Sequence, residues 1–435
     1  MRAAARQRLS FLPLLAVVFF NVSGGPYGVE DAVSVFGPGL TLLLLALTPL
    51  LVSTPFALAM AEMAGALPEE GGYVAWVRRA FGPFWSFQVG WWSWLNSFVD
   101  VAVYPALFAD YLRFWRPEMT SVERWFLALA FVWLLTAVNL SGVRVTGWGA
   151  VALSAGALSP IVVLAVAAAG HAGHAPWAPF AAPGQGLWSG LGVGIAVMMW
   201  NYSGWDTPST ILGETDRPGS SYRRALWWAL PLIALAYIVP VAAALAATGD
   251  WQRWHTGYWP VVASQVGGPW LAGAVVAGAV TATAGLFLSL VLTNSRLPYV
   301  LALQGQLPRW LAVTHRRTGV PWAAVLLSSA VYSVCALWSF KELIVLNVWL
   351  YSLTLLLELA AFVALRLREP ALPRPWRVGG GSAGFWLTAA LPSAAALLAM
   401  ATAGWKNTAA GVLAAFTGPV AWLLWRRGGR RSGRR

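Results

Sequence analysis

The sequence predicts an all-α membrane protein with twelve transmembrane helices, and three observations lead to this prediction. Hydrophobic residues make up 58% of the 435 residues, whereas charged residues make up only 10%, far below the roughly 25% of soluble domains. Apolar runs of about 20 residues, long enough to cross a bilayer about 30 Å thick, recur along the whole chain. The 29 basic residues gather in alternate loops. A soluble enzyme is therefore disfavoured, and the net charge of +13 indicates membrane orientation and no nucleic-acid partner.

The first helix is expected to start at residue 11 and to be interrupted in its middle. The N-terminus, MRAAARQRLSFLPLLAVVFF, has the basic and apolar stretches of a signal peptide, but no small-x-small cleavage site follows. The segment from Asn21 to Gly28 reads NVSGGPYG, and apolar sequence then resumes. We therefore interpret this region as a broken transmembrane helix.

Eleven further apolar runs predict the remaining spans. They lie at about residues 39–66, 83–112, 123–141, 147–170, 187–214, 223–247, 269–300, 321–340, 343–366, 384–403 and 408–425. An even number of spans places both termini on one side, and the loops on that side hold 23 basic residues against six on the other. The positive-inside rule makes that side cytoplasmic in an integral protein of the cell membrane.

The sixth run also carries an interruption, which predicts an internal repeat. It reads GLGVGIAVMMWNYSGWDTPSTILGE, with Gly204 and Pro208 at mid-membrane. Gly24 and Gly204 occupy corresponding positions if residues 11–170 and 187–366 form two inverted five-helix repeats, followed by two additional helices in 384–425 and a basic cytoplasmic tail in 426–435. Paired interruptions of this kind indicate a midplane transport site within one transmembrane domain. The alternative is that these glycines only permit close helix packing or a kink.

Broken helices offer two electrostatic poles to a substrate. Non-helical backbone survives at membrane depth only inside protein or beside an aqueous cavity. Amides at the start of a half-helix suit a carboxylate, and carbonyls at the end of the opposite half suit an ammonium group. The two poles together favour an amino acid as the substrate.

Four long motifs resemble a known family. VSGGPYGVED, AEMAGALPEEGGYVAWVRRAFGPFWSFQVGWW, FVDVAVYPALFADYL and WNYSGWDTPSTILGE are similar to sequences of plant and protozoan polyamine uptake transporters, which belong to the amino acid-polyamine-organocation (APC) superfamily of permeases. SRLPYVLALQGQLPRWL and ELAAFVALRLREPALPRPWRV resemble the more general permease pattern. The resemblance covers nearly the whole chain and implies the LeuT-like five-plus-five inverted-repeat fold.

One departure from the polyamine transporters concerns the eighth span. Where they carry a Glu, this chain reads GLFLSLVLTNSR, and Leu288 takes the acidic place. Losing a carboxylate from a site for several ammonium groups favours an amino acid over a polyamine. Polyamine import, of putrescine or spermidine, is the alternative.

The resemblance also implies a substrate site around the two breaks. Its backbone groups for a substrate carboxylate would come from Ser23, Gly24 and Gly25. Its carbonyls for an amine would come from Trp200, Asn201 and Ser203, and Gly204 would leave room for the substrate side chain. Tyr202 and Trp205 are the candidates for closing over the substrate, although packing is the default role for any Trp among 28.

Acidic residues within spans are costly and so need an explanation, functional or paired. Asp206 ranks first, as a contact for a cationic substrate or as a proton carrier, with helix capping as the alternative. Asp100 is the second candidate for substrate contact or proton coupling. Glu30 and Asp31 are candidates for coupling, although capping of the second half-helix is favoured. Two further acids, Glu62 and Glu358, lie near the cytoplasmic ends and are expected to form ion pairs with Arg.

The residue types in the spans limit which ion can be coupled to transport and which enzymatic chemistry is expected. Some relatives carry the coupled proton on a Lys of span five. This chain has no Lys in that span, so a carboxylate would have to carry the proton. Proton symport is favoured over exchange, and exchange over sodium, for which the hydroxyls of Thr283, Ser289 and Thr293 are candidates. No P-loop sequence, metal-ligand cluster or paired nucleophile and base stands out, so we expect no cofactor, no metal and no enzymatic activity.

These observations together predict a secondary active permease for a small amine-bearing solute, working by alternating access in the lipid bilayer. The sequence is compatible with a monomer or a homodimer. A hypothesis from another class is a non-transporting membrane sensor built on the same fold.

Overall fold

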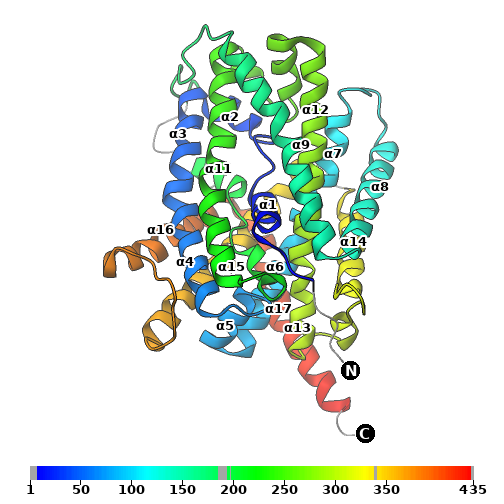
Figure 1. Ribbon diagram of the computed structural model, residues 1–435, viewed down its shortest axis with the longest axis vertical. Helices are drawn as coiled ribbons and strands as arrows, with labels where there is room; N and C mark the ends of the chain where they lie inside the picture. Colours follow the sequence, from blue (N-terminus) through cyan, green and yellow to red (C-terminus); the bar gives the residue numbers. More distant parts are fainter. Residues whose placement is uncertain (1–6, 185–193, 196, 338–339, 433–435) are drawn as a thin grey trace.

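The computed structural model describes residues 7–184, 194–195, 197–337 and 340–432, and this part of the chain forms a bundle of helices (Figure 1). The α-helices are α1 (Phe11–Val22), α2 (Glu30–Phe36), α3 (Pro38–Thr48), α4 (Thr54–Ala66), α5 (Tyr73–Phe81), α6 (Pro83–Asp100), α7 (Val103–Leu112), α8 (Ser121–Leu140), α9 (Val143–Ala169), α11 (Pro218–Ala247), α12 (Trp259–Asn294), α13 (Arg296–Leu303), α14 (Trp322–Cys335), α15 (Phe340–Arg368), α16 (Gly381–Thr402) and α17 (Trp405–Ser432). Short 3₁₀ or π turns complete it: η1 (Pro49–Ser53), η2 (Thr207–Glu214), η3 (Trp251–Arg253) and η4 (Arg309–Ala312).

The helices are long and apolar enough to define a membrane protein. Within the described ranges, eight helical stretches can cross a bilayer by length and composition, and two shorter apolar helices are α1 and α14. Extended pairing in the same ranges is limited to one isolated bridge between Leu9 and Thr215. The all-α membrane class is therefore confirmed, whereas the count of twelve spans and the inverted repeat stay predictions.

Both predicted helix interruptions are present. The first lies between Val22, where α1 ends, and Glu30, where α2 begins. The second follows Asn201, the last helical residue before Thr207 opens η2. Residues 187–193 and 196 of the predicted sixth span lie outside the described residues.

Two predicted spans have different boundaries in the structure. The run at 83–112 forms two helices, α6 and α7, separated by a turn at Val101 and Ala102. The run at 269–300 starts earlier, because α12 begins at Trp259 and bends at Gly268, which has a φ of 76°. Gly268 permits this bend, since a positive φ costs a glycine little.

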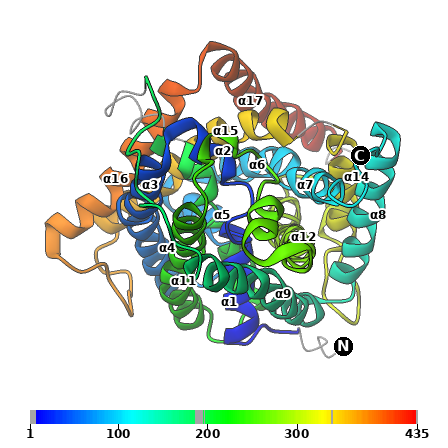
Figure 2. The same ribbon diagram turned by 90° about the horizontal axis from the view of Figure 1, so that it is seen from above.

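α1 crosses the middle of the bundle. Seen from above, α1 lies between α9, α11 and α12, and α15 and α6 lie on the other side of the centre (Figure 2). The side chains of α1 are mostly buried, including Phe19, Phe20 and the polar Asn21. The two interrupted segments therefore meet inside protein, where non-helical backbone avoids contact with lipid.

One end of the bundle is closed by ion pairs, and we call it the basic end. Arg296 of α13, fully buried, pairs with Glu214 at 2.8 Å. Glu62 of α4 accepts from Arg366 of α15 and lies 3.3 Å from Arg374 in the loop that follows. The expected ion pairing of Glu62 with Arg is thus present. A buried guanidinium and carboxylate stay charged only when they are paired in this way.

A further pair at the basic end is exposed. Arg79 of α5 pairs with Glu369 at 2.7 Å. The hydrogen bond from Arg79 holds the pKa of Glu369 below its usual range. The pair therefore stays formed at neutral and mildly acidic pH.

Hydrogen bonds to two acids of α2, which accept them, close the opposite end. Asp31 accepts from the backbone and hydroxyl of Thr256, at 3.0 and 2.8 Å. Glu30 accepts from the Tyr111 hydroxyl at 2.9 Å and from the amides of Gly28 and Gly257. These acids fix the loop before α12 and the end of the first break, whereas the N-cap of α2 has no side-chain hydrogen bond, so the capping role stays a prediction.

Candidate functional site

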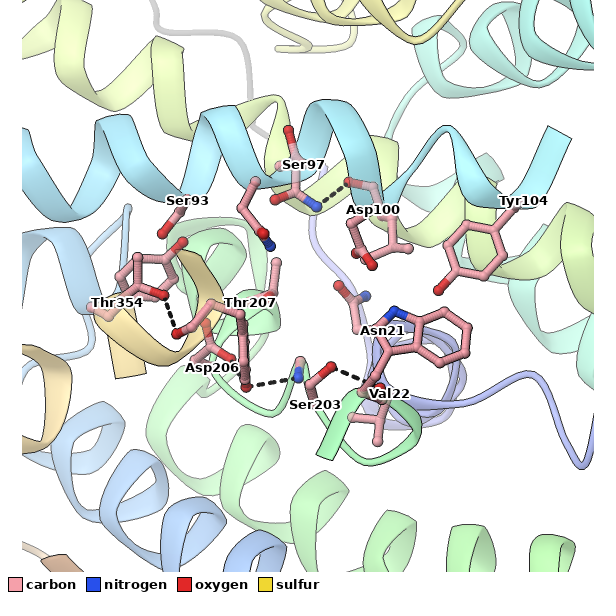
Figure 3. Close-up of a pocket in the computed structure, with 17 residues that line it drawn as sticks. Asn21, Val22, Ser93, Ser97, Asp100, Tyr104, Ser203, Asp206, Thr207 and Thr354 are labelled. Atoms are coloured by element: carbon pink, nitrogen blue, oxygen red, sulfur yellow. Dashed lines mark hydrogen bonds between the residues drawn. The ribbon is translucent and has the colours of Figure 1, made fainter. Parts of the chain in front are cut away.

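A polar cavity lies where the two interruptions meet (Figure 3). Its walls come from the end of α1, from α5, α6, α7, α12 and α15, and from the second break. The lining residues are Asn21, Val22, Tyr73, Ser93, Asn96, Ser97, Asp100, Tyr104, Trp200, Ser203, Gly204, Asp206, Thr207, Leu290, Asn294, Tyr351 and Thr354. Two carboxylates and no Lys, Arg or His occur among them, so the described lining is acidic.

Asp206 lies directly after the second break and is almost fully buried. Its side chain makes no capping hydrogen bond to η2. It accepts instead from the Tyr351 hydroxyl at 3.1 Å, and that hydroxyl accepts from the Gly204 amide at 2.9 Å. Tyr351 thereby joins α15 to the break and holds the Asp206 carboxylate at the cavity wall.

Asp100 reaches the same cavity from a different element. It is the last residue of α6, is half-buried, and lies near Tyr104 at the start of α7. Figure 3 shows Asp100 by α6 on one side of the cavity and Asp206 with Ser203 on the other side. A cationic substrate in the cavity therefore meets carboxylates from two elements.

A second cavity adjoins the first and shares Val22, Tyr104 and Trp200 with it. Its remaining lining is mostly apolar and aromatic, namely Ser23, Gly24, Tyr27, Leu107, Asn201, Tyr237, Ala282, Thr283 and Leu286. No carboxylate occurs among these described residues. The pair of cavities thus offers an acidic compartment beside an aromatic one.

The predicted site residues divide between these compartments. Trp200, Ser203, Gly204, Asp206 and Asp100 line the acidic cavity. The second cavity is lined by Ser23, Gly24, Asn201 and, again, Trp200. These predicted residues therefore lie together around the two cavities, and the substrate-binding role of each stays a prediction.

Three predicted site residues line neither cavity. Tyr202 points away and donates to the carbonyl of Leu45 at 2.9 Å. Trp205 is buried and donates to the Tyr202 carbonyl at 2.7 Å. The Gly25 amide donates to Ser23 Oγ at 3.0 Å. Local hydrogen bonds at the breaks thus hold these groups in the scaffold.

Gly204 has a structural role at the contact between the two breaks. It has a φ of 95°, and a Cβ at this position would collide with the carbonyl oxygen of Asn21. The missing side chain therefore allows the two breaks to touch, in addition to any space left for a substrate.

The three hydroxyls considered for sodium do not converge. Thr283 lines the second cavity, whereas Thr293, about 15 Å further along the helix axis, donates to Asn21 Oδ1 at 2.8 Å. Ser289 Oγ is buried without a hydrogen-bond partner among the described residues. Glu30 and Asp31 lie outside both cavities.

Leu288 also bears on the substrate. It is buried and packs against Gly149 of α9, and it lines neither cavity. A carboxylate at that position would thus belong to the contact between α12 and α9. The absence of an acid at Leu288 therefore removes nothing from the acidic cavity, and this argument against a polyamine loses its basis.

Several lining residues were not singled out from the sequence. Tyr73, Asn96, Tyr351 and Thr354 come from helices without an interruption. Usable signals existed in α15, where Tyr351, Thr354 and Glu358 follow each other at helical spacing in an apolar run, and in α6, where Asn96 stands at helical spacing with Ser93 and Asp100.

An all-helical membrane fold with a polar cavity between two interrupted helices is typical of a membrane permease. The chain belongs to the amino acid permease family of the APC superfamily, whose model matches residues 9–424. It is 38% identical to a probable polyamine transporter of Arabidopsis thaliana over 92% of this chain and 83% of that protein. It is 34% identical to the polyamine transporter PUT1 of Oryza sativa subsp. japonica over 92% of this chain and 75% of that protein. The polyamine transporter RMV1 of Arabidopsis thaliana is also 34% identical, over 87% of this chain and 77% of its own length.

Proposed function

We propose that this permease imports polyamines across the cell membrane by proton-coupled alternating access. The observation that carries the proposal is the acidic cavity, in which Asp100 and Asp206 come from separate walls and no basic residue occurs among the described lining residues. Two carboxylates suit a molecule with two or more ammonium groups. Relatives that are named polyamine transporters cover most of the chain, which supports the same substrate class.

An amino acid, the substrate that the sequence favoured, is the second candidate. The name of the matching family favours it. An amino acid also needs donors for its carboxylate, and the first break was expected to provide them. There the amides of Gly25 and Gly28 already donate to Ser23 Oγ and Glu30, and the Val29 amide donates to the Pro26 carbonyl. The Ser23 amide donates to the Phe19 carbonyl as well, so two of the three residues expected to hold a carboxylate have engaged amides, which favours a substrate without one.

The proposal includes twelve spans arranged as two inverted five-helix repeats plus two helices. The interruptions after Val22 and after Asn201 support this arrangement, because they lie at corresponding positions of the two halves. We place the basic end and both termini in the cytoplasm by the positive-inside rule. The buried acids support proton coupling, and the hydroxyls considered for sodium do not converge among the described residues.

Equilibrium binding to purified protein tests the substrate class. Asp100→Asn and Asp206→Asn should each weaken putrescine binding, because losing one partner of a desolvated charge pair costs about 2 to 5 kcal/mol, or about thirtyfold or more in affinity. Asp110→Asn is the matched control, since Asp110 pairs with Arg124 outside the cavity. Unchanged putrescine affinity in both cavity variants, or binding of alanine in place of putrescine, would contradict the proposal.

A further inference from the structure

Glu358 is a buried acid that the cavity description leaves unexplained. The sequence led us to expect an ion pair with Arg, yet the nearby arginine of the same helix, Arg366, pairs with Glu62. Glu358 is 2% exposed, and neither of its carboxylate oxygens has a hydrogen-bond partner among the described residues. A buried carboxylate without a partner does not stay ionised, because the cost of desolvation favours the neutral acid.

The position of Glu358 connects it to the cavity. Tyr351, Thr354 and Glu358 follow at i, i+3 and i+7 on α15, which places them along one face of the helix. Tyr351 and Thr354 line the cavity, whereas Glu358 lies about 6 Å beyond Thr354 along the helix axis, toward the basic end. Glu358 therefore lies directly behind the cavity wall on that side.

Glu358 and Asp206 form an interacting pair of acids. They repel each other electrostatically, so the buried region does not hold both as anions. Asp206 accepts a hydrogen bond from Tyr351, which stabilises its charge, whereas Glu358 accepts none. The proton of the pair therefore belongs to Glu358.

The other titratable groups around Glu358 do not take its place as the site of this proton. Tyr73 of α5, Tyr222 of α11 and Tyr351 interact with both acids and are neutral phenols. Glu62 of α4 is already paired, about 12 Å further along α15 at the level of Arg366. Asp100 of α6 lines the cavity, Asp110 of α7 pairs with Arg124, and α16 contributes no titratable side chain.

Two hydrogen bonds at and next to Tyr73, a residue that interacts electrostatically with Glu358, join two short elements. The amide of Gly71 donates to the Thr210 carbonyl at 3.1 Å, and the amide of Tyr73 donates to Ser209 Oγ at 3.3 Å. These bonds link the start of α5 to η2. Their separation would open the basic end and bring water to Glu358.

We propose that Glu358 carries the coupled proton, an inference that rests on the proposed proton-coupled import. With the basic end closed, Glu358 holds the proton. When α5 and η2 separate, the O–H bond of Glu358 breaks and the proton passes to water. The closed conformation thus binds one proton more than the open one, which links proton movement to the conformational cycle.

Transport by reconstituted full-length protein tests the inference. A gradient of about one pH unit supports about tenfold accumulation at one proton per substrate, provided that the membrane potential is clamped. Wild-type protein should accumulate putrescine to this level. Glu358→Gln, which imitates the protonated acid, should exchange putrescine across the membrane at a rate close to wild type but fail to accumulate it. Glu358→Asp should retain some accumulation, because it remains ionisable.

Asp110→Asn is the matched control, since Asp110 pairs with Arg124 and lines neither cavity. It should still accumulate putrescine. If wild type accumulates putrescine and Glu358→Gln does so equally, the inference is wrong while the proposed function stands. If wild type transports without responding to the gradient, proton coupling itself fails, and the inference fails with it.

A spectroscopic measurement covers the case in which Glu358→Gln is inactive. Infrared difference spectra between neutral and alkaline pH should show the carbonyl stretch of a protonated carboxylic acid in the folded wild type, and this band should be absent from Glu358→Gln. Retention of the band in Glu358→Gln would overturn the assignment.

Discussion

At the residue scale, the acidic cavity depends on how each carboxylate is held. Asp206 is placed by the Tyr351 hydroxyl, which also accepts from the Gly204 amide. A hydroxyl that accepts one hydrogen bond and donates another fixes both partners, because its two roles are satisfied together. Tyr351 is therefore a positioning residue for Asp206.

Tyr351→Phe should weaken putrescine binding while leaving the fold intact. A hydrogen bond to a charged group contributes about 1.5 to 3 kcal/mol, so the expected loss is about tenfold or more in affinity. Isothermal titration calorimetry measures it. Tyr332→Phe is the control, because the Tyr332 hydroxyl contacts Ser97 and does not line the cavity. Equal affinities of Tyr351→Phe and Tyr332→Phe would refute the positioning role.

Single residues also show the limits of prediction from sequence. Asp206 and Asp100 could be selected because acids are rare in apolar runs. Tyr351 could not, because a tyrosine in a membrane span has many uses and its partners lie 145 and 147 positions away. Tyr202 and Trp205 line neither cavity in this structure, because the sequence does not show which way a side chain turns at a break, and their role at the substrate stays a prediction.

At the element scale, the two interruptions act as one unit. Gly204 adopts a φ of 95° and lies against the carbonyl oxygen of Asn21, so the breaks contact each other through backbone. The sequence predicted both breaks from glycine and proline in apolar runs. Their mutual contact was not predictable, because it depends on how α1 crosses the bundle.

Gly204→Ala should destabilise the protein strongly. The substitution adds a collision with the Asn21 carbonyl to the strain of a positive φ, which alone costs about 1 to 2 kcal/mol. Gly268→Ala is the matched control, because Gly268 has a φ of 76° but open space around its Cα. Thermal unfolding in detergent should show the larger loss for Gly204→Ala. Equal losses would mean that the close contact is unimportant.

At the scale of the whole molecule, the distribution of charge sets the orientation. The loops next to Glu214, Arg296, Arg366 and Arg374 form the basic end, and hydrogen bonds of Glu30 and Asp31 close the other. The alternation of basic loops predicted this separation. The number of spans and the repeat were not settled by the helices alone, because part of the sixth predicted span lies outside the described residues.

Cysteine labelling from each side of the membrane tests the orientation. Cys335 is the only cysteine, so a Cys335→Ala protein provides the background. Ser220→Cys, exposed at the basic end, should react with an impermeant thiol reagent only from the cytoplasmic side. Ala172→Cys, exposed in the loop after α9, should react only from the outside. The reverse pattern would invert the proposed topology.

The pH response of transport also belongs to the whole molecule. The lowered pKa of Glu369 keeps this carboxylate ionised and paired with Arg79 except at strongly acidic pH. The contribution of the pair to folding stability is lost only as the pH falls through that lowered pKa. The exposed pair therefore does not titrate near neutrality. A change of uptake rate in that range would therefore not report on this pair.

Uptake of radiolabelled solutes by reconstituted protein tests the central claim most directly. Putrescine, arginine, alanine and leucine are supplied to liposomes with and without an inward proton gradient. The account predicts that putrescine accumulates when the gradient is present and that the amino acids neither accumulate nor compete with it. Gradient-driven accumulation of alanine or leucine, without transport of putrescine, would contradict it.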